Sequence, residues 1–221
     1  MPERRVFRPR TRRSGYRDAS LIVIASEGQN PERQYFEDLV SPENYPNPRV
    51  YLEVIERDPG PFSPSHVLES LNKFRREYGL SAEDELWIVI DRDRWTPREL
   101  STVCTQCRQK GYRTAVSNPC FELWLLLHVK QMDEYSPEEI LQLEQNLRQP
   151  NNRTRIEEEL RRSLGSYRKN NIESSRILTG LPVAIAQARS LDVDPDNRWP
   201  NRLGTHVYRL VERVLPPGIF R

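Results

Sequence analysis

The sequence predicts an α/β fold in which a parallel β-sheet has helices on both faces and is followed by a helical C-terminal half. The first observation behind this prediction is that apolar, β-branched runs typical of parallel strands alternate with segments of helical periodicity over the first 120 residues. The second is that only helical signals continue from Phe121 onward. In such a fold, ligands gather beyond the carboxyl ends of the strands.

Four apolar segments are predicted to form the strands. They span residues 21–25, 50–55, 86–90 and 113–116, and the third is the most hydrophobic. Helix starts between them are marked by a capping residue directly before a proline, at Asn30-Pro31, Ser63-Pro64 and Thr96-Pro97. We therefore expect a helix after each of the first three strands, with Asn30 capping the first.

The region after the sheet is predicted to consist of helices packed on it. A capping box at residues 136–139 precedes an apolar stripe, and residues 149–152 read as a turn. Further helices are expected through residues 160–164, 183–191 and 206–215. The chain accordingly divides into a basic arm (residues 1–18), an α/β core (19–130) and a helical C-terminal region (131–221).

The predicted arm is strongly basic, whereas the rest of the chain is acidic. Residues 1–17 contain seven arginines; beyond them, 27 of the 34 basic and 31 of the 32 acidic side chains remain, which gives a net charge of −4. Because the segment has no apolar periodicity, we predict that it is disordered. Its arginines, in particular Arg8, Arg10, Arg12 and Arg13, could neutralise nucleic-acid phosphates, and a solvated leader without that role is an equal alternative.

Composition excludes several classes of protein. The longest apolar run, residues 123–129, is too short to cross a bilayer, and the N-terminus lacks the apolar core of a signal peptide. Three cysteines do not make a disulfide framework, which agrees with a reducing compartment. We predict a cytoplasmic protein without a membrane segment, in which Cys104 and Cys107 lie in the core and do not hold zinc.

Carboxylates follow the first and third predicted strands. Glu27 comes directly after the first, and Asp91 and Asp93 directly after the third. Carboxylates crowded at the end of a buried sheet are costly unless a hard cation such as Mg²⁺ or Mn²⁺ offsets their charge. Alternatively, Asp91 and Asp93 are turn formers paired with neighbouring arginines. Together with Glu27, they favour a metal site.

Three segments resemble the RloB-like family. They are Ile-Ala-Ser-Glu-Gly at residues 24–28, Asp-Arg-Asp at 91–93 and Ser-Asn-Pro-Cys-Phe-Glu-Leu-Trp at 117–124, and the likeness runs from about residue 20 to residue 214. The family is regarded as having a Toprim domain, as in topoisomerases, primases and OLD nucleases, where a glutamate and an Asp-x-Asp hold Mg²⁺. The resemblance implies a Toprim-like core, metal-binding roles for Glu27, Asp91 and Asp93, and antiviral defence with an ATPase partner.

Other side chains are weaker candidates. Glu122 could be a fourth ligand or hold a metal-bound water, or it could simply be a first-turn glutamate favoured by the helix dipole. Lys169 lies in a segment between helices and could pair with charge on a phosphate, with Tyr167 stacking on a base; the alternative is a solvated loop. Asn118 is expected to cap the helix after the fourth strand, with contact to substrate as the alternative. Trp95 could border a nucleotide site.

These observations predict a metal-dependent nuclease that cleaves DNA or RNA. Asp91 and Asp93 would hold Mg²⁺ or Mn²⁺, Glu27 would act as ligand or base, and Glu122 and Lys169 would support catalysis. The rival hypothesis is a non-cleaving, Toprim-like adaptor or nucleic-acid-binding effector that regulates an ATPase partner.

Overall fold

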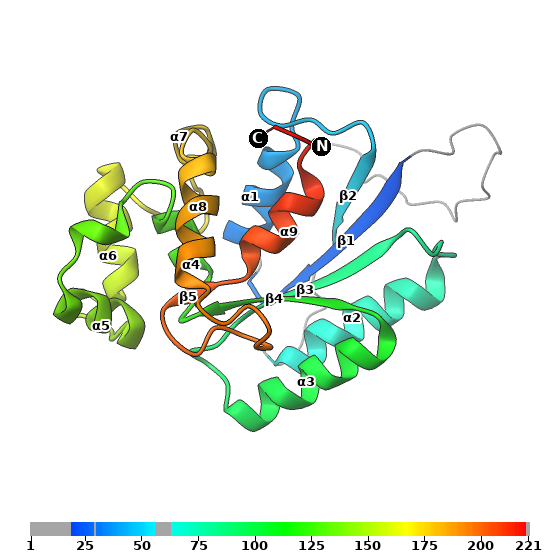
Figure 1. Ribbon diagram of the computed structural model, residues 1–221, viewed down its shortest axis with the longest axis horizontal. Helices are drawn as coiled ribbons and strands as arrows, with labels where there is room; N and C mark the ends of the chain where they lie inside the picture. The colour runs from blue at the N-terminus through cyan, green and yellow to red at the C-terminus, as the bar shows by residue number, and fades with distance from the viewer. Residues whose placement is uncertain (1–18, 29, 56–62, 220–221) are drawn as a thin grey trace.

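The computed structural model describes residues 19–28, 30–55 and 63–219. The predicted basic arm, with Arg8, Arg10, Arg12 and Arg13, lies outside these described residues. Within them, a mixed α/β domain continues into a helical C-terminal half (Figure 1), so the predicted fold class is confirmed.

The sheet contains four parallel strands and one short antiparallel strand. The parallel strands are β1 (Ser20–Ser26), β2 (Val50–Val54), β3 (Glu85–Asp91) and β4 (Arg113–Asn118), and β5 (Gly204–Thr205) pairs antiparallel with β4. The spatial order is β2-β1-β3-β4-β5, so β1 and β3 are neighbours at the centre. All four predicted strands are confirmed, whereas β5 was not predicted.

Helices cover both faces of the sheet, as expected. The helices α2 (Pro64–Glu77) and α3 (Pro97–Lys110) lie on one face, and α1 (Pro31–Leu39) and α9 (Val207–Val214) lie on the other (Figure 1). Successive side chains of β1 point to opposite faces, so Val23 packs in the cluster with α2 and α3, whereas Ile24 packs in the cluster with α1 and α9. Both faces of the central strand are therefore buried.

The helical half is joined to the sheet through one continuous core. It comprises α4 (Phe121–Leu126), a 3₁₀ turn (Met132–Glu134), α5 (Pro137–Gln145), α6 (Arg155–Leu164), α7 (Ser174–Leu178) and α8 (Leu181–Leu191). Leu143 of α5 and Leu160 of α6 belong to the same buried cluster as Ile24 of β1. The 3₁₀ turn and α7 were not predicted, because each is too short to show a periodic apolar pattern.

Most predicted helix starts are confirmed, but one cap is not. The side chains of Ser63, Thr96 and Ser136 accept hydrogen bonds from backbone N–H groups in the first turn of the helix that each precedes. Asn30 occupies the cap position of α1 without capping it, because its Nδ2 donates to Oδ1 of Asn170 at 3.0 Å. The side chain of Asn30 thus forms a hydrogen bond with a distant segment of the chain instead of the predicted cap of α1.

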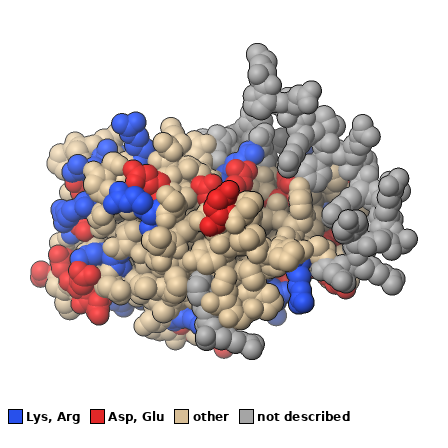
Figure 2. All heavy atoms as spheres, turned by 90° about the horizontal axis from the view of Figure 1, so that it is seen from above, with Lys and Arg blue, Asp and Glu red and all other residues tan. Residues whose placement is uncertain are grey.

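Charges of both signs alternate over the surface of the helical half (Figure 2). Along α6, Arg161 pairs with Glu158 at 2.8 Å and Arg162 with Glu159 at 3.0 Å. In the described part of the chain, none of the helices is both long and apolar enough to cross a membrane.

The predicted core positions of the cysteines are confirmed, and two tryptophans also lie in the core. Cys104 and Cys107 are buried on α3, and Trp87 and Trp124 are almost fully buried. Burial raises the pKa of the Cys107 thiol to about 12, so this side chain stays protonated at neutral pH.

Candidate functional site

Three of the predicted site residues meet where β1 and β3 end. Glu27 directly follows β1, and its backbone N–H donates to the carbonyl of Val89 in β3 at 3.0 Å. The N–H of Asp91, the last residue of β3, lies 3.4 Å from Oε2 of Glu27. Oδ1 of Asp91 accepts from the N–H of Phe121 at 2.8 Å, which places Glu122 in the first turn of α4 beside these carboxylates.

Lys169 reaches the same place from the segment between α6 and α7. Its Nζ lies 2.7 Å from Oε1 of Glu122 and 2.7 Å from Oε1 of Glu157 in α6. The lysine extends from an exposed loop, but two carboxylates hold its ammonium group. Burial disfavours the charged form of Lys169, but the two carboxylates outweigh it and raise the pKa of the ammonium above its ordinary value.

Tyr167 is not positioned to stack on a base, which was one of two alternatives for this segment. Its ring is buried in the core, and its hydroxyl lies 3.5 Å from Oε1 of Glu122. Glu122 is thus contacted from one side by a buried tyrosine and from another by an ammonium group.

Glu32 belongs to this group of acids but went unnoticed in the sequence. It is a buried residue in the first turn of α1, and a Cβ added to Gly28 would lie 2.2 Å from its Oε1. The missing side chain of Gly28 therefore leaves the space that the carboxylate of Glu32 fills. Oε2 of Glu32 is buried and has no hydrogen-bond partner among the described residues. An acid in a first turn is so common that only the preceding Glu27-Gly28 pair could have signalled it.

The buried acids raise each other's pKa values. Burial, followed by repulsion from Glu122 and Glu27, raises the pKa of Glu32 to about 7. The pKa of Asp91 is raised well above its ordinary range by burial and by the neighbouring carboxylates Glu122, Glu32, Glu27 and Asp93. Such a group of acids retains protons at neutral pH unless a cation compensates its charge.

Asp93 and Glu122 have different surroundings. Asp93 is exposed at the rim, yet partial desolvation of its carboxylate outweighs the attraction of Arg94 and raises its pKa to about 6. For Glu122, burial favours the neutral acid, but the ion pair with Lys169 prevails and holds the pKa below its ordinary value. Glu122 is therefore ionised at neutral pH without a further cation.

The segment after Asp93 lies against Glu27. Nε1 of Trp95 donates to Oε2 of Glu27 at 2.8 Å, and Nη1 of Arg94 lies 3.5 Å from Oε1. Trp95 therefore borders the carboxylates. Arg92 points elsewhere and donates to the carbonyl of Asn201 at 2.7 Å, so it is not the ion-pair partner that the turn-former alternative supposed.

Asn118 was expected to cap α4, and this prediction is wrong. Cys120 occupies the cap position, and a cis peptide bond joins Asn118 to Pro119. Nδ2 of Asn118 donates to the carbonyls of Pro200 at 3.2 Å and Arg202 at 2.7 Å. Asn118 instead ties the segment before β5 to the end of β4, next to the acids.

The donor chemistry of the site fits a hard divalent cation, although the side chains are not converged on one. All five acids offer oxygen, and Oε2 of Glu32 has no hydrogen bond from the described residues. However, among the described residues no three His, Cys, Asp or Glu side chains are arranged to hold a metal ion. Oε2 of Glu27 and Oδ1 of Asp91 accept hydrogen bonds from Trp95 and from the N–H of Phe121. These side chains would have to move closer together to share a cation.

Fold and site together define an α/β protein with a buried acidic site at the carboxyl ends of its central strands. A family model described as RloB-like protein matches residues 22–214. The chain therefore belongs to the RloB-like family. Comparison with curated proteins and with solved structures gave no match.

Proposed function

We propose that this protein is a Mg²⁺- or Mn²⁺-dependent nuclease with a Toprim-type site. The observation that supports this most is the meeting of Glu27, Glu32, Asp91 and Glu122 at one edge of the sheet, with the pKa values of Glu32 and Asp91 raised by mutual repulsion. A divalent cation would relieve that repulsion, polarise a phosphoryl oxygen and stabilise the leaving oxygen of a phosphodiester.

The proposal gives each side chain a task. Glu27, Asp91 and Asp93 hold the cation, and the unpaired oxygen of Glu32 is a further donor. Glu122 holds Lys169 through an ion pair at 2.7 Å, so that the half-exposed ammonium can contact a phosphate oxygen of the substrate. DNA and RNA both fit these roles.

The proposed context is antiviral defence together with an ATPase partner, in the cytoplasm. Family membership is the support for this part of the proposal. The arginines of residues 1–17 would add salt-dependent affinity for nucleic acid.

A specific observation favours a second candidate, the non-cleaving adaptor. Trp95 and Arg94 both contact the carboxylate of Glu27, and no metal-binding arrangement is present among the described residues. A domain that regulates an ATPase partner would need no cation at this edge.

The test is cleavage by the purified full-length protein with its ATPase partner present. We expect Mg²⁺ or Mn²⁺ to support hydrolysis of at least one of supercoiled DNA, linear DNA, single-stranded DNA or RNA, and a chelator to stop it. Hydrolysis that survives chelation would contradict the metal-dependent proposal. Intact substrates under every one of these conditions would favour the adaptor.

A further inference from the structure

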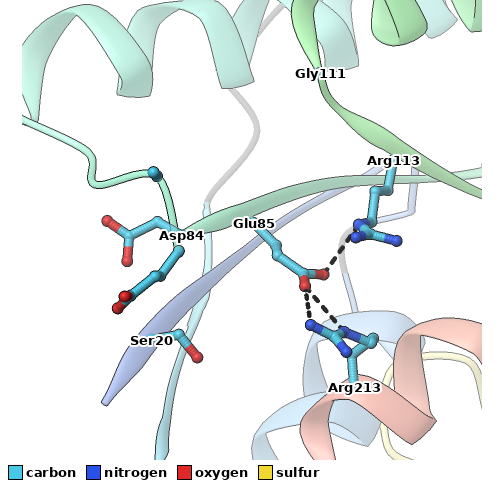
Figure 3. A pocket seen from close by; sticks show the side chains of 8 residues that line it. Ser20, Asp84, Glu85, Gly111, Arg113 and Arg213 are labelled. Carbon is cyan, nitrogen blue, oxygen red and sulfur yellow. Dashed lines mark hydrogen bonds and ion pairs between the residues drawn. The ribbon is translucent and has the colours of Figure 1, made fainter. Parts of the chain in front are cut away.

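A second group of charged side chains lies at the opposite edge of the sheet, where the strands begin. A cavity of about 570 Å³ at this edge is lined by five arginines and one carboxylate. The arginines are Arg108, Arg113, Arg198, Arg209 and Arg213. A neighbouring cavity of about 620 Å³ shares Gly111, Arg113 and Arg213 with the first (Figure 3).

Four of these arginines are held in place by other side chains. Arg113 and Arg213 both pair with Glu85, with Nε to carboxylate oxygen distances of 3.2 Å and 2.9 Å (Figure 3). Nη1 of Arg198 lies 3.0 Å from the hydroxyls of both Ser101 and Thr105 on α3. A guanidinium that is fixed before binding loses less conformational entropy when it meets an anion.

Arg209 is fixed in the same way. Its Nη2 lies 2.6 Å from Oδ2 of Asp192, and its guanidinium lies 5.7 Å from the centre of the Tyr208 ring. The arginines of the cavity are therefore positioned from β4, α3, α9 and the segment before β5, which lie far apart in the sequence.

Positive charge is in excess at this cavity. The five arginines are accompanied by three carboxylates that line the cavity or pair with them, those of Glu85, Asp192 and Glu212. Glu85 serves two arginines, and Arg108 and Arg198 have no carboxylate within ion-pair distance among the described residues. Like charges held together in this way repel one another, and a bound anion with several negative charges would relieve the repulsion.

The surroundings favour a compact anion over an extended one. The neighbouring cavity is lined by Glu83 and Asp84, so the basic surface turns acidic within the same groove. The phosphates of a nucleic-acid strand that follows the groove would be repelled by these carboxylates. A small ligand with two or three adjacent phosphates can bind the guanidiniums without meeting the acids, and guanidinium groups bind phosphate oxygens in pairs.

We propose that this arginine cavity binds a small polyphosphorylated ligand, such as a nucleoside di- or triphosphate, at a site separate from the acidic one. The length of β3, seven residues from Glu85 to Asp91, puts the two sites about 20 Å apart. This inference does not depend on the proposed nuclease activity, because the acidic site has no part in the binding.

The test measures binding of inorganic tripolyphosphate and of ATP by calorimetry at low salt, with a chelator present so that the acidic site holds no cation. The probe variant is the double substitution Arg108→Gln and Arg198→Gln, which leaves no carboxylate of the cavity unpaired. The control is Arg76→Gln with Arg161→Gln on α2 and α6, which removes the same charge elsewhere. We expect saturable binding to the parent, at least about tenfold weaker binding to the probe variant, and unchanged binding to the control.

Comparing the two ligands shows which part of the ligand the cavity recognises. Binding of single-stranded DNA to the parent and to the probe variant is measured in parallel. Stronger binding of ATP than of tripolyphosphate identifies a nucleotide, and equal binding identifies the phosphates alone as the recognised group; both support the cavity. The proposal is overturned if neither ligand binds, if the probe variant binds as well as the control, or if only single-stranded DNA loses affinity in the probe variant. Asp91→Asn should leave this binding unchanged whether or not the protein cleaves nucleic acid.

Discussion

Replacing Asp91 by asparagine is expected to abolish metal-dependent cleavage while leaving the fold intact. Asparagine keeps an oxygen that can accept the N–H of Phe121, the 2.8 Å hydrogen bond that joins β3 to α4. It removes one negative charge that the proposed cation needs as a ligand. Without the cation, the transition state loses several kcal/mol of stabilisation, which lowers the rate of cleavage by about 10³-fold or more. The measurement is the initial rate of cleavage in Mn²⁺ with the proposed ATPase partner supplied.

The matched control for this variant is Asp133→Asn, the same change at an exposed acid of the 3₁₀ turn. It should cleave at the parental rate. Because the pKa of Asp91 is raised by burial and by its acidic neighbours, Asp91→Asn should also melt at or above the parental temperature in chelator. Equal cleavage by Asp91→Asn and the parent would rule out Asp91 as a metal ligand.

Replacing Glu32 by glutamine is expected to stabilise the metal-free protein, and more so as the pH rises. The pKa of Glu32 is raised to about 7, so the stability that the neutral acid contributes is present below about pH 4.5 and is lost as the pH rises through about 7. Glutamine stays neutral throughout this range. Its advantage over the parent should therefore grow from near zero at about pH 4 to as much as about 3 kcal/mol at about pH 8.

The measurement is urea unfolding of the parent and Glu32→Gln across that pH range in chelator, with Glu138→Gln, at an exposed acid of α5, as the control. Saturating Mn²⁺ should shrink the advantage of Glu32→Gln, because a cation stabilises the ionised carboxylate of the parent. A stability difference that does not change with pH would contradict the raised pKa of Glu32.

The strands and most helix starts could be predicted because their signals are local. A proline directly after a serine or threonine marked α2, α3 and α5, and buried strands appeared as continuous apolar runs. Two-residue β5 could not be predicted, because its pairing of Thr205 with Ser117 has no pattern of its own. Asn30 and Asn118 were assigned wrongly for one reason: both side chains bind partners from segments far along the chain.

Part of the acidic site could be predicted from the sequence because of the topology of the sheet. Acids that follow parallel strands lie at one edge, and the order β2-β1-β3 makes the strands before Glu27 and Asp91 direct neighbours. The sequence did not reveal Glu32, which comes to the site because α1 starts beside Gly28. The ion pair of Lys169 with Glu122 was also hidden, because it depends on how α6 and the segment after it pack against α4.

The central claim is that the acids at the ends of β1 and β3 share a divalent cation, and anomalous X-ray diffraction from crystals soaked in Mn²⁺ tests it most directly. The account predicts a peak bound by carboxylate oxygens of Glu27 and Asp91, and no such peak in crystals of Asp91→Asn. A fully soaked crystal with the parental fold and no peak among Glu27, Glu32, Asp91, Asp93 and Glu122 would contradict it.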